Sequence, residues 1–414
     1  MSNATLAPFR TRSFRFQWPA DLCTAWAMEM ETLILGWYVL VESGSVMLLT
    51  VFGSLLFIGT LLSPLLGTVA DRLGLRRVLT MMRLCYAAFS ILILTLTLAG
   101  LLTPTLVLVV AALSGLIKPT DIGMRSAMVG ATVPPEHLTA AMGISRTTMD
   151  TAKICGALAG SGFVALAGMG PTYGLVVVLY LTGALLTRQM DSGRVVHPAG
   201  TRVPDRTSAL ADLREGMTYI WRTPRLLAAM TVAALVNLTA YPLTIGLLPH
   251  VARDVFHIGQ QGLGLLVASF AGGALIGSIA ISVLGARLRP AWTMMATVIA
   301  WHVFLLGFVL APGPAVAMVL LACAGVCQSL GMLTLSILLL RTSEARFRGR
   351  IMGVRMLAIY PLPVGLLIAG ALVERIGFIA SGILMLVAGL LLVAAVLVTW
   401  RADLLPRDAP GNAG

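Results

Sequence analysis

Long apolar stretches dominate this chain, and they limit how it can fold more than any other feature. A helix needs about 20 mostly apolar residues to cross a bilayer, where only helices and closed barrels satisfy their own backbone. The chain is 58% hydrophobic and 11% charged with a mean hydropathy of +0.93, which is too apolar for a water-soluble domain. We therefore predict an all-α membrane protein with twelve transmembrane helices. The predicted spans are residues 14–41, 46–70, 78–101, 104–126, 138–167, 171–190, 225–250, 260–286, 290–311, 314–341, 350–374 and 377–400.

One long interruption separates six of the predicted spans from the other six. Residues 191–224 begin with Gly, Pro and Arg residues and end in an apolar pattern of helical spacing that Ser208 could cap. The segment is too short to bury a core, so we expect a cytoplasmic linker with an amphipathic helix on the inner membrane face. The predicted domains are residues 1–190 and 225–401, each a six-helix bundle, with a cytoplasmic tail at 402–414.

Positive charge is distributed unevenly among the loops of this chain, whose formal net charge is +12. Only Arg253 and Arg375 fall in loops that we place outside the membrane, and Lys118 and Lys153 lie within spans. The other Lys and Arg residues lie in or near loops on one side, which predicts that both termini are cytoplasmic. A nucleic-acid site would need a contiguous basic surface, so we expect no nucleic-acid partner. Residues 1–17 contain no small-residue cleavage site, so we predict no removable signal peptide.

The sequence offers no signature of an enzyme or of a bound cofactor. It contains neither an HExxH zinc motif nor a GxSxG nucleophile elbow, and no phosphate-binding loop for ATP. All five cysteines lie inside apolar spans, where a free cysteine packs as a small hydrophobic residue. We therefore expect no catalytic residues, no metal and no cofactor, and any active transport would draw on a proton gradient.

A short charged turn, GTVADRLGLRRVL at residues 67–79, connects the second and third spans. Glycines at Gly67 and Gly74 permit a tight turn with a left-handed residue. Asp71 can accept hydrogen bonds from the N-terminus of a neighbouring helix, and the arginines of the turn hold it on the cytoplasmic side.

This turn resembles the signature loop of the major facilitator superfamily, although Leu75 replaces the basic residue usual there. The matching residues are Gly67, Ala70, Asp71, Arg72, Gly74 and Arg76. The resemblance implies two pseudo-symmetric six-helix bundles with alternating access, and weak echoes between the second and eighth spans and between the fifth and eleventh agree with a duplicated half. It also implies that the loop formed by Gly67, Asp71, Arg72, Gly74 and Arg76 has a gating role, while a purely topological role remains open.

A finer likeness extends over GWYVL at 36–40, ATVPPEHLTAA at 131–141, DLREGMTYIWRTP at 212–224 and RGRIMG at 348–353. These segments resemble the bacterial exporter branch that includes the enterobactin and other siderophore exporters. The likeness implies a monomeric, proton-coupled siderophore exporter of the bacterial inner membrane, with a multidrug efflux antiporter as the alternative and an uptake permease as a further one. Antiporters of the superfamily often carry a Gly-Pro pair in the fifth span, and here Ala157 stands in place of that proline.

Ionisable residues inside membrane spans are costly, so they usually face a cavity or a partner. Two helices of the first half each present a basic-acidic-basic stripe on one face. The residues are Lys118, Asp121 and Arg125 in the fourth span, and Arg146, Asp150 and Lys153 in the fifth. Two interpretations remain open, namely a structural ion-pair network and a set of groups that change partner or protonation during transport.

The first span also carries acidic residues, and these are further candidates for proton coupling. Glu29 and Glu31 are about 200° apart around a helix, so at most one of them can face a given cavity. A carboxylate in a partly apolar cavity can bind and release a proton near neutral pH, and we favour Glu31 over Glu29 as the carrier. A structural partner for Lys118 or Lys153 is the competing role. Asp150 and Asp121 complete the set of candidates, and we expect Asp21 to be solvated or to cap a helix.

The second half carries mainly neutral polar and aromatic groups, which suit hydrogen bonding and stacking with a bulky, partly apolar small molecule. Its candidate cavity residues are Asn237, Tyr241, Gln328, Arg355 and Tyr360. A single histidine in an apolar helix, such as His302, is more often a satisfied core residue than a ligand.

Overall fold

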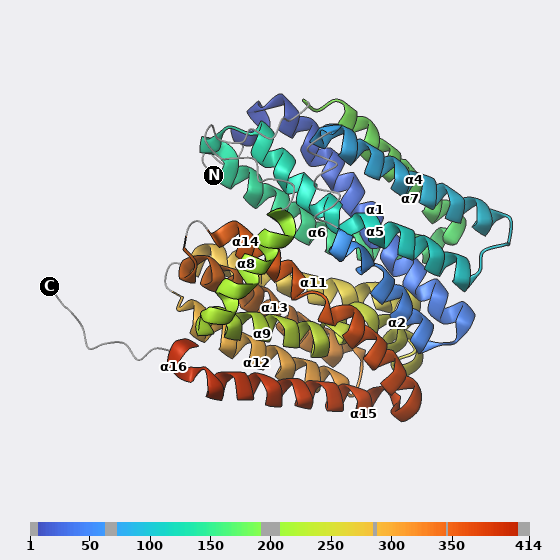
Figure 1. Cartoon of the computed structure of the whole chain (residues 1–414). Coiled ribbons are helices and arrows are strands. Elements are labelled where there is room, and N and C mark those ends of the chain that lie inside the picture. The colour runs from blue at the N-terminus through green and yellow to red at the C-terminus, as the bar shows by residue number, and fades with distance from the viewer. Residues whose placement is uncertain (1–6, 63–72, 192–207, 285–287, 345–346, 405–414) are drawn as a thin grey trace. The chain divides into compact units, whose positions relative to one another are not determined.

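The computed structural model describes residues 7–62, 73–191, 208–284, 288–344 and 347–404 (Figure 1). Every secondary-structure element in this part of the chain is helical. It divides into two compact units, of which unit 1 comprises residues 1–203 and 246–272 and unit 2 comprises residues 204–245 and 273–414. Residues 246–272 thus group with the first unit, and the predicted division into residues 1–190 and 225–401 stays a prediction.

In unit 1, α1 packs against α6 and α7, and α4 packs against α7 and α5 (Figure 1). The core between α1, α4 and α7 is apolar and aromatic, with Met30, Ile34, Tyr86, Tyr173 and Tyr180 fully or almost fully buried. The helices of this unit are η1 (Ala7–Arg10), α1 (Arg12–Ser43), α2 (Val46–Leu55), η2 (Ile58–Leu62), α4 (Leu75–Leu98), α5 (Pro104–Thr132), α6 (Pro135–Ala167), α7 (Met169–Arg188), α10 (Leu248–His250) and η4 (Val251–Val255).

In unit 2, α12 packs against α13 and α15, and α9 packs against α15 and α13. The helices of this unit are α8 (Ser208–Arg222), α9 (Pro224–Thr239), α12 (Pro290–Val309), α13 (Pro314–Thr342), α14 (Arg348–Leu357), α15 (Pro361–Thr399) and α16 (Arg401–Leu404). Two elements cross the boundary between the units, namely η3 (Pro242–Gly246) and α11 (Gly259–Leu284).

The predicted spans coincide with helices, and the differences have local causes. The fourth span runs on to Thr132 rather than to residue 126. The described part of the second span is divided between α2 and η2, and residues 63–70 of that span and 285–286 of the eighth lie outside the described residues. The seventh span is interrupted after Thr239, where proline removes backbone donors, and continues as a π-helical turn and a short helix. The eleventh breaks before Pro361, and Gly377, at φ 78°, separates it from the twelfth within α15.

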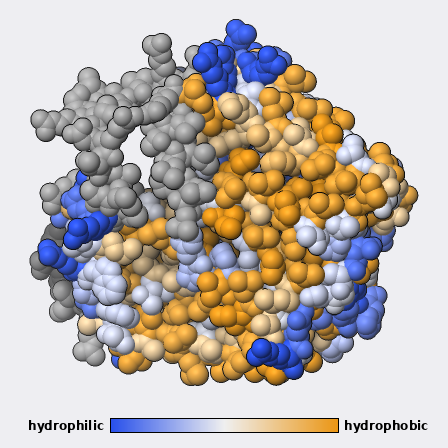
Figure 2. All heavy atoms as spheres, turned by 45° about the vertical axis from the view of Figure 1, so that its right-hand side comes forward, coloured by the Kyte–Doolittle hydropathy of each residue, from blue (hydrophilic) through white to orange (hydrophobic). Residues whose placement is uncertain are grey.

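Large apolar side chains are exposed on several helices, among them Leu166 at 85% and Val398 at 77%. Figure 2 shows one face of the molecule, on which apolar side chains form a broad surface with hydrophilic side chains at its margins. Eight helices of the described part are long and apolar enough to cross a membrane. An apolar surface of this extent matches lipid tails rather than water.

The predicted amphipathic segment forms α8, which packs against α14 within unit 2. The rings of Tyr219 and Phe347 stack with centroids 4.2 Å apart, and Arg350 Nη1 lies 2.9 Å from Glu215 Oε2. Trp221 remains 65% exposed. The cap predicted at Ser208 involves side chains outside the described residues, and the position of α8 on the membrane stays a prediction.

Two adjacent glycines of α11 provide a test of helix packing in unit 2. A Cβ on Gly273 would overlap the backbone carbonyl of Ala322 in α13, whereas a Cβ on Gly272 would meet nothing within 4 Å. We expect Gly273→Ala to cost about 1–3 kcal/mol, because two backbones would have to separate. The thermal midpoint of the detergent-solubilised protein should fall for Gly273→Ala and hold for Gly272→Ala. Equal midpoints for the two variants would contradict this close approach.

Candidate functional site

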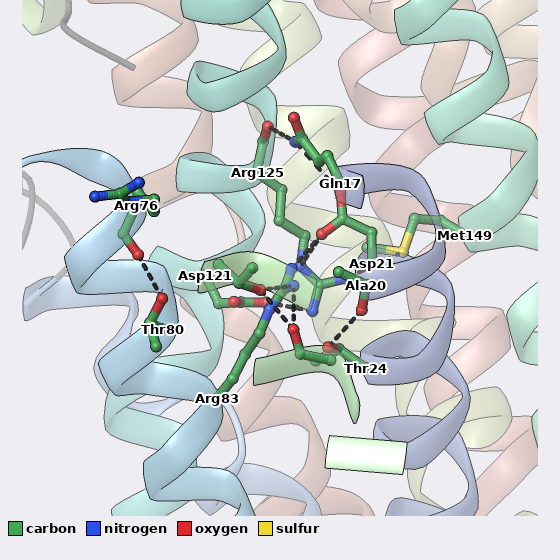
Figure 3. A network of polar contacts seen from close by, with 12 residues as sticks. Gln17, Ala20, Asp21, Thr24, Arg76, Thr80, Arg83, Asp121, Arg125 and Met149 are labelled. Atoms are coloured by element: carbon green, nitrogen blue, oxygen red, sulfur yellow. Dashed lines mark hydrogen bonds and ion pairs between the residues drawn. The ribbon is translucent and has the colours of Figure 1, made fainter. Parts of the chain in front are cut away.

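Unit 1 buries a cluster of charged side chains contributed by three helices (Figure 3). Arg83 of α4 is fully buried, and its guanidinium donates to Asp21 Oδ1 of α1, to Thr187 Oγ1 of α7 and, at 3.2 Å, to the carbonyl of Gly183. Arg125 of α5 pairs with Asp121 one turn earlier.

Arg125 also connects the α5 pair to α1. Its Nε lies 3.8 Å from Asp21 Oδ1, and its carbonyl accepts a hydrogen bond of 2.9 Å from Gln17 Nε2. The resulting polar cluster, defined as Asp21, Arg83, Asp121 and Arg125, contains two acids and two bases. Because a buried charge is tolerated only when it is paired, this balance explains how four ionised groups can lie inside the unit.

The structure corrects one expectation and adds one residue. Asp21 was expected to be solvated or to cap a helix, but it is buried and paired with two arginines. Arg83 was not among the predicted site residues, because it follows the arginines of the 67–79 turn and resembles part of that basic group. Its signal in the sequence is an isolated charge two helical turns beyond Arg76, where the segment has already become apolar.

Glu31 lies in a second polar site on the same helix. It is 4% exposed, and its two carboxylate oxygens accept hydrogen bonds of 2.9 Å from Ser90 of α4 and Tyr180 of α7. Lys118 of α5 donates to Thr32 at 3.3 Å, and both Glu31 and Lys118 line a small cavity of about 10 Å³. The structure therefore brings these two predicted residues to one cavity, where Glu31 is held by neutral donors and forms no ion pair with Lys118 within 4 Å.

Glu29 is not among the residues that line this cavity. Its Cβ lies 2.7 Å from the position that a Cβ on Gly156 of α6 would occupy, so it points along the α1–α6 contact. Gly160, one turn later on α6, would likewise meet Met30 at 3.1 Å. Small residues at this spacing let α1 and α6 approach closely.

Each of the two predicted charge stripes forms one ion pair, and its lysine takes no part in that pair. In α6, Arg146 Nε lies 3.1 Å from Asp150 Oδ2, and the Asp150 side chain is buried although that of Arg146 is 58% exposed. Lys153 is exposed and forms no ion pair with a described residue. The pairs Asp121–Arg125 and Arg146–Asp150 are thus present, while Lys118 and Lys153 stand apart from them.

The signature turn is described only from residue 73 onward. Gly67, Asp71 and Arg72 lie outside the described residues. Gly74 adopts φ 85° at the start of α4, which is the left-handed turn residue predicted there. Arg76 Nη1 donates to the carbonyl of Met190 at 2.9 Å and so connects the start of α4 to the segment after α7.

In unit 2, Tyr241 and Gln328 come together. Gln328 Nε2 donates to Tyr241 Oη at 2.7 Å, and the ring of Tyr241 meets Trp301 edge-on with centroids 4.9 Å apart. Asn237 instead donates to Ala233 of its own helix at 2.8 Å.

The remaining polar groups of unit 2 take different positions. Arg355 lies near the end of α14, and Tyr360 precedes α15 with its hydroxyl unpaired among the described residues. His302 is fully buried and contacts Thr239 at 3.0 Å and the Val298 carbonyl at 2.9 Å, as expected of a satisfied core residue.

Comparison with known proteins identifies the family. The family model described as "Transmembrane secretion effector", from the major facilitator superfamily, matches residues 3–412. The chain belongs to this family. A relative, the multidrug efflux pump Tap of Mycolicibacterium fortuitum, is 28% identical to this transporter over 380 residues, covering 86% of this chain and 89% of Tap.

Solved structures agree on the fold of this transporter. A mutant of the nucleoside transporter NupG is 14% identical and aligns over 94% of this chain and 99% of its own with a TM-score of 0.73. A bacterial homologue of the human lysosomal transporter Spinster is 12% identical and aligns over 99% and 100% with a TM-score of 0.70. The predicted major facilitator fold is confirmed, and the protein is a multi-pass membrane transporter rather than an enzyme.

The polar cluster of this transporter predicts how its stability responds to substitution. Arg83→Met removes a partner from buried Asp21, a loss that typically costs about 3–5 kcal/mol. We expect a lower yield of monodisperse protein and a lower thermal midpoint in detergent. The double variant Asp21→Asn, Arg83→Met should recover part of the loss, because it removes both charges. Arg77→Met, at an exposed arginine of the same helix, is the matched control, and an equal midpoint for Arg83→Met and Arg77→Met would contradict the role of the cluster.

Proposed function

We propose that this transporter is a proton-coupled exporter of small amphipathic compounds of the multidrug type, working by alternating access. The observation that carries the coupling is Glu31, a buried carboxylate that lines a cavity and is held by Ser90 and Tyr180 rather than by a cation. The direction of transport is supported by the similarity to the multidrug efflux pump Tap.

Glu31 is better suited to carry a proton than the acids of the polar cluster. Asp21 and Asp121 are paired with arginines, and protonating either would leave a buried guanidinium short of its partner. Glu31 accepts from two hydroxyls, so protonation would remove no ion pair. Lys118 lines the same cavity, and its positive charge would favour the charged form of Glu31 in one conformation of the transporter. In another conformation, with Lys118 further away, Glu31 would accept a proton.

Coupling would arise because proton and substrate prefer different conformations of the transporter. Proton entry at Glu31 would bias one state, and the substrate would occupy a cavity that Tyr241, Gln328 and Tyr360 help to recognise. The hydroxyl and amide of the Tyr241–Gln328 pair and the ring of Trp301 offer hydrogen bonding and stacking to a partly apolar molecule. The loop that contains Gly74 and Arg76 would act as the gate.

The sequence supports a bacterial inner-membrane location with both termini in the cytoplasm, because the positive loops lie on one side. A siderophore, favoured from sequence likeness alone, remains a prediction, while the relative Tap favours the multidrug alternative. A substrate panel should therefore contain lipophilic dyes and a catecholate siderophore side by side.

Inside-out membrane vesicles test the direction of transport and the substrate class. With an acid-interior proton gradient, vesicles that contain the transporter should accumulate a lipophilic dye such as ethidium, and a protonophore should abolish the accumulation. Vesicles from cells without the protein are the control. Accumulation of the siderophore alone would favour siderophores over multidrug-type compounds as the substrate. Transport in the opposite direction would refute export.

Substitution of Glu31 tests the coupling residue. Glu31→Gln keeps the shape of the side chain and resembles its protonated form, but it cannot release a proton, so gradient-driven accumulation should fall to background. Exchange of labelled for unlabelled dye without a gradient should survive, because it requires no net proton movement. Glu29→Gln is the matched control on the same helix and should keep accumulation. If Glu31→Gln transports with full coupling, another group carries the proton.

A further inference from the structure

A second pocket lies at the C-terminal end of α1, within unit 1, and is lined by other residues than the Glu31 cavity. It has a volume of about 170 Å³, is partly open to solvent, and shares no lining residue with that cavity. Its polar and aromatic lining comes from Trp37, Tyr38 and Glu42 of α1 and Gln260 of α11, and Val164 and Met169 add apolar surface. Sites that enclose a whole drug-sized ligand measure about 300–1,000 Å³, so this smaller, partly open pocket would enclose one part of such a ligand.

The charge at this pocket is negative. Glu42 is exposed next to the last residue of α1, and its carboxylate has no ion-pair partner among the described residues. The C-terminal end of a helix adds partial negative charge. Arg253, whose guanidinium donates to the Leu40 carbonyl nearby, is itself neutralised by Asp254 at 2.7 Å. A ligand in this pocket would therefore gain from carrying positive charge.

A residue that lines the pocket carries an unused hydrogen-bond donor. The Nε2 of Gln260 is buried and has no partner among the described residues. A buried donor without an acceptor is unfavourable, and an acceptor on the ligand would relieve this cost. The ring of Tyr38 is held in place by a hydrogen bond of 2.8 Å from its hydroxyl to the Leu102 carbonyl, so it offers a fixed aromatic surface. Aromatic faces of this kind attract organic cations.

We propose that this pocket is a binding site for lipophilic organic cations that carry a hydrogen-bond acceptor. Glu42 provides the counter-charge, Trp37 and Tyr38 the aromatic surface, and Gln260 the donor. In the predicted orientation α1 ends at the outer membrane face, so the pocket would hold cargo close to its release. This transport role rests on the proposed export function, whereas the binding itself does not.

The test measures the Kd of two organic cations for the purified full-length protein in detergent. Binding is detected by the fluorescence of the cation or by competition with a fluorescent cation. Rhodamine 6G is a lipophilic cation with an ester carbonyl, and tetraphenylphosphonium is one without an acceptor. Glu42→Gln should raise the Kd of both cations about three- to tenfold. Gln260→Leu should raise the Kd of rhodamine 6G by a similar factor and leave that of tetraphenylphosphonium unchanged, because only the first ligand uses the amide.

Matched controls separate this site from general effects. Glu136→Gln removes an exposed carboxylate from the first turn of α6 and should leave both Kd values unchanged. Glu42→Asp keeps the charge and should retain binding, which distinguishes a loss of charge from a loss of fold. Unchanged binding of both cations in Glu42→Gln and Gln260→Leu would overturn the proposal.

The outcome for the export function is independent of this result. If the wild-type protein binds rhodamine 6G with the predicted pattern but accumulates no dye in energised inside-out vesicles, the site stands and the proposed function fails. If dye accumulates normally while both pocket variants bind like the wild type, export stands and the site fails.

Discussion

Electroneutrality inside unit 1 is the constraint on which the rest of this structure depends. A bilayer offers no water to solvate a buried charge, so Asp21, Arg83, Asp121 and Arg125 can be accommodated only as a mutually compensating set. Their pairing fixes the rotation of α1, α4 and α5 relative to one another, because each of these helices must turn its charged residue inward. The same rotation directs Ser90 of α4 toward Glu31 of α1.

The polar cluster and Glu31 differ in what a proton would do there. Ten residues of helix separate Asp21 from Glu31, a rise of about 15 Å, so the two sites lie at different depths of the unit. In the cluster every acid is committed to an arginine, and a proton would break an ion pair. At Glu31 the acid is hydrogen-bonded to Ser90 and Tyr180, and Lys118 donates to Thr32 instead. Our assignment of coupling to Glu31 therefore follows from the charge balance as much as from its burial.

Local features of the fold and site could be predicted from sequence, whereas contacts between distant helices could not. Hydropathy located the spans, and helical spacing gave the pairs Asp121–Arg125 and Arg146–Asp150. The angle between Glu29 and Glu31 predicted that only one of them lines the cavity, and in the structure this is Glu31. The partnership of Asp21 with Arg83 joins residues 62 positions apart, and no periodicity within one helix encodes it. Lys153 illustrates the same limit, because its stripe on α6 says nothing about what packs against that face.

The fold alone does not determine what this transporter carries. Structures only 12–14% identical to it, a nucleoside transporter and a POT family transporter among them, align with TM-scores up to 0.73, so the helical framework tolerates nearly complete replacement of side chains. Selectivity must then arise from particular groups on that framework. Among the described residues, the buried Asp, Glu and Arg side chains lie in unit 1, and unit 2 offers the neutral groups Tyr241, Gln328 and Trp301. Under the proposed function, this asymmetry suits a division in which unit 1 binds the proton and unit 2 recognises a partly apolar substrate. No single site would then have to be both charged and apolar.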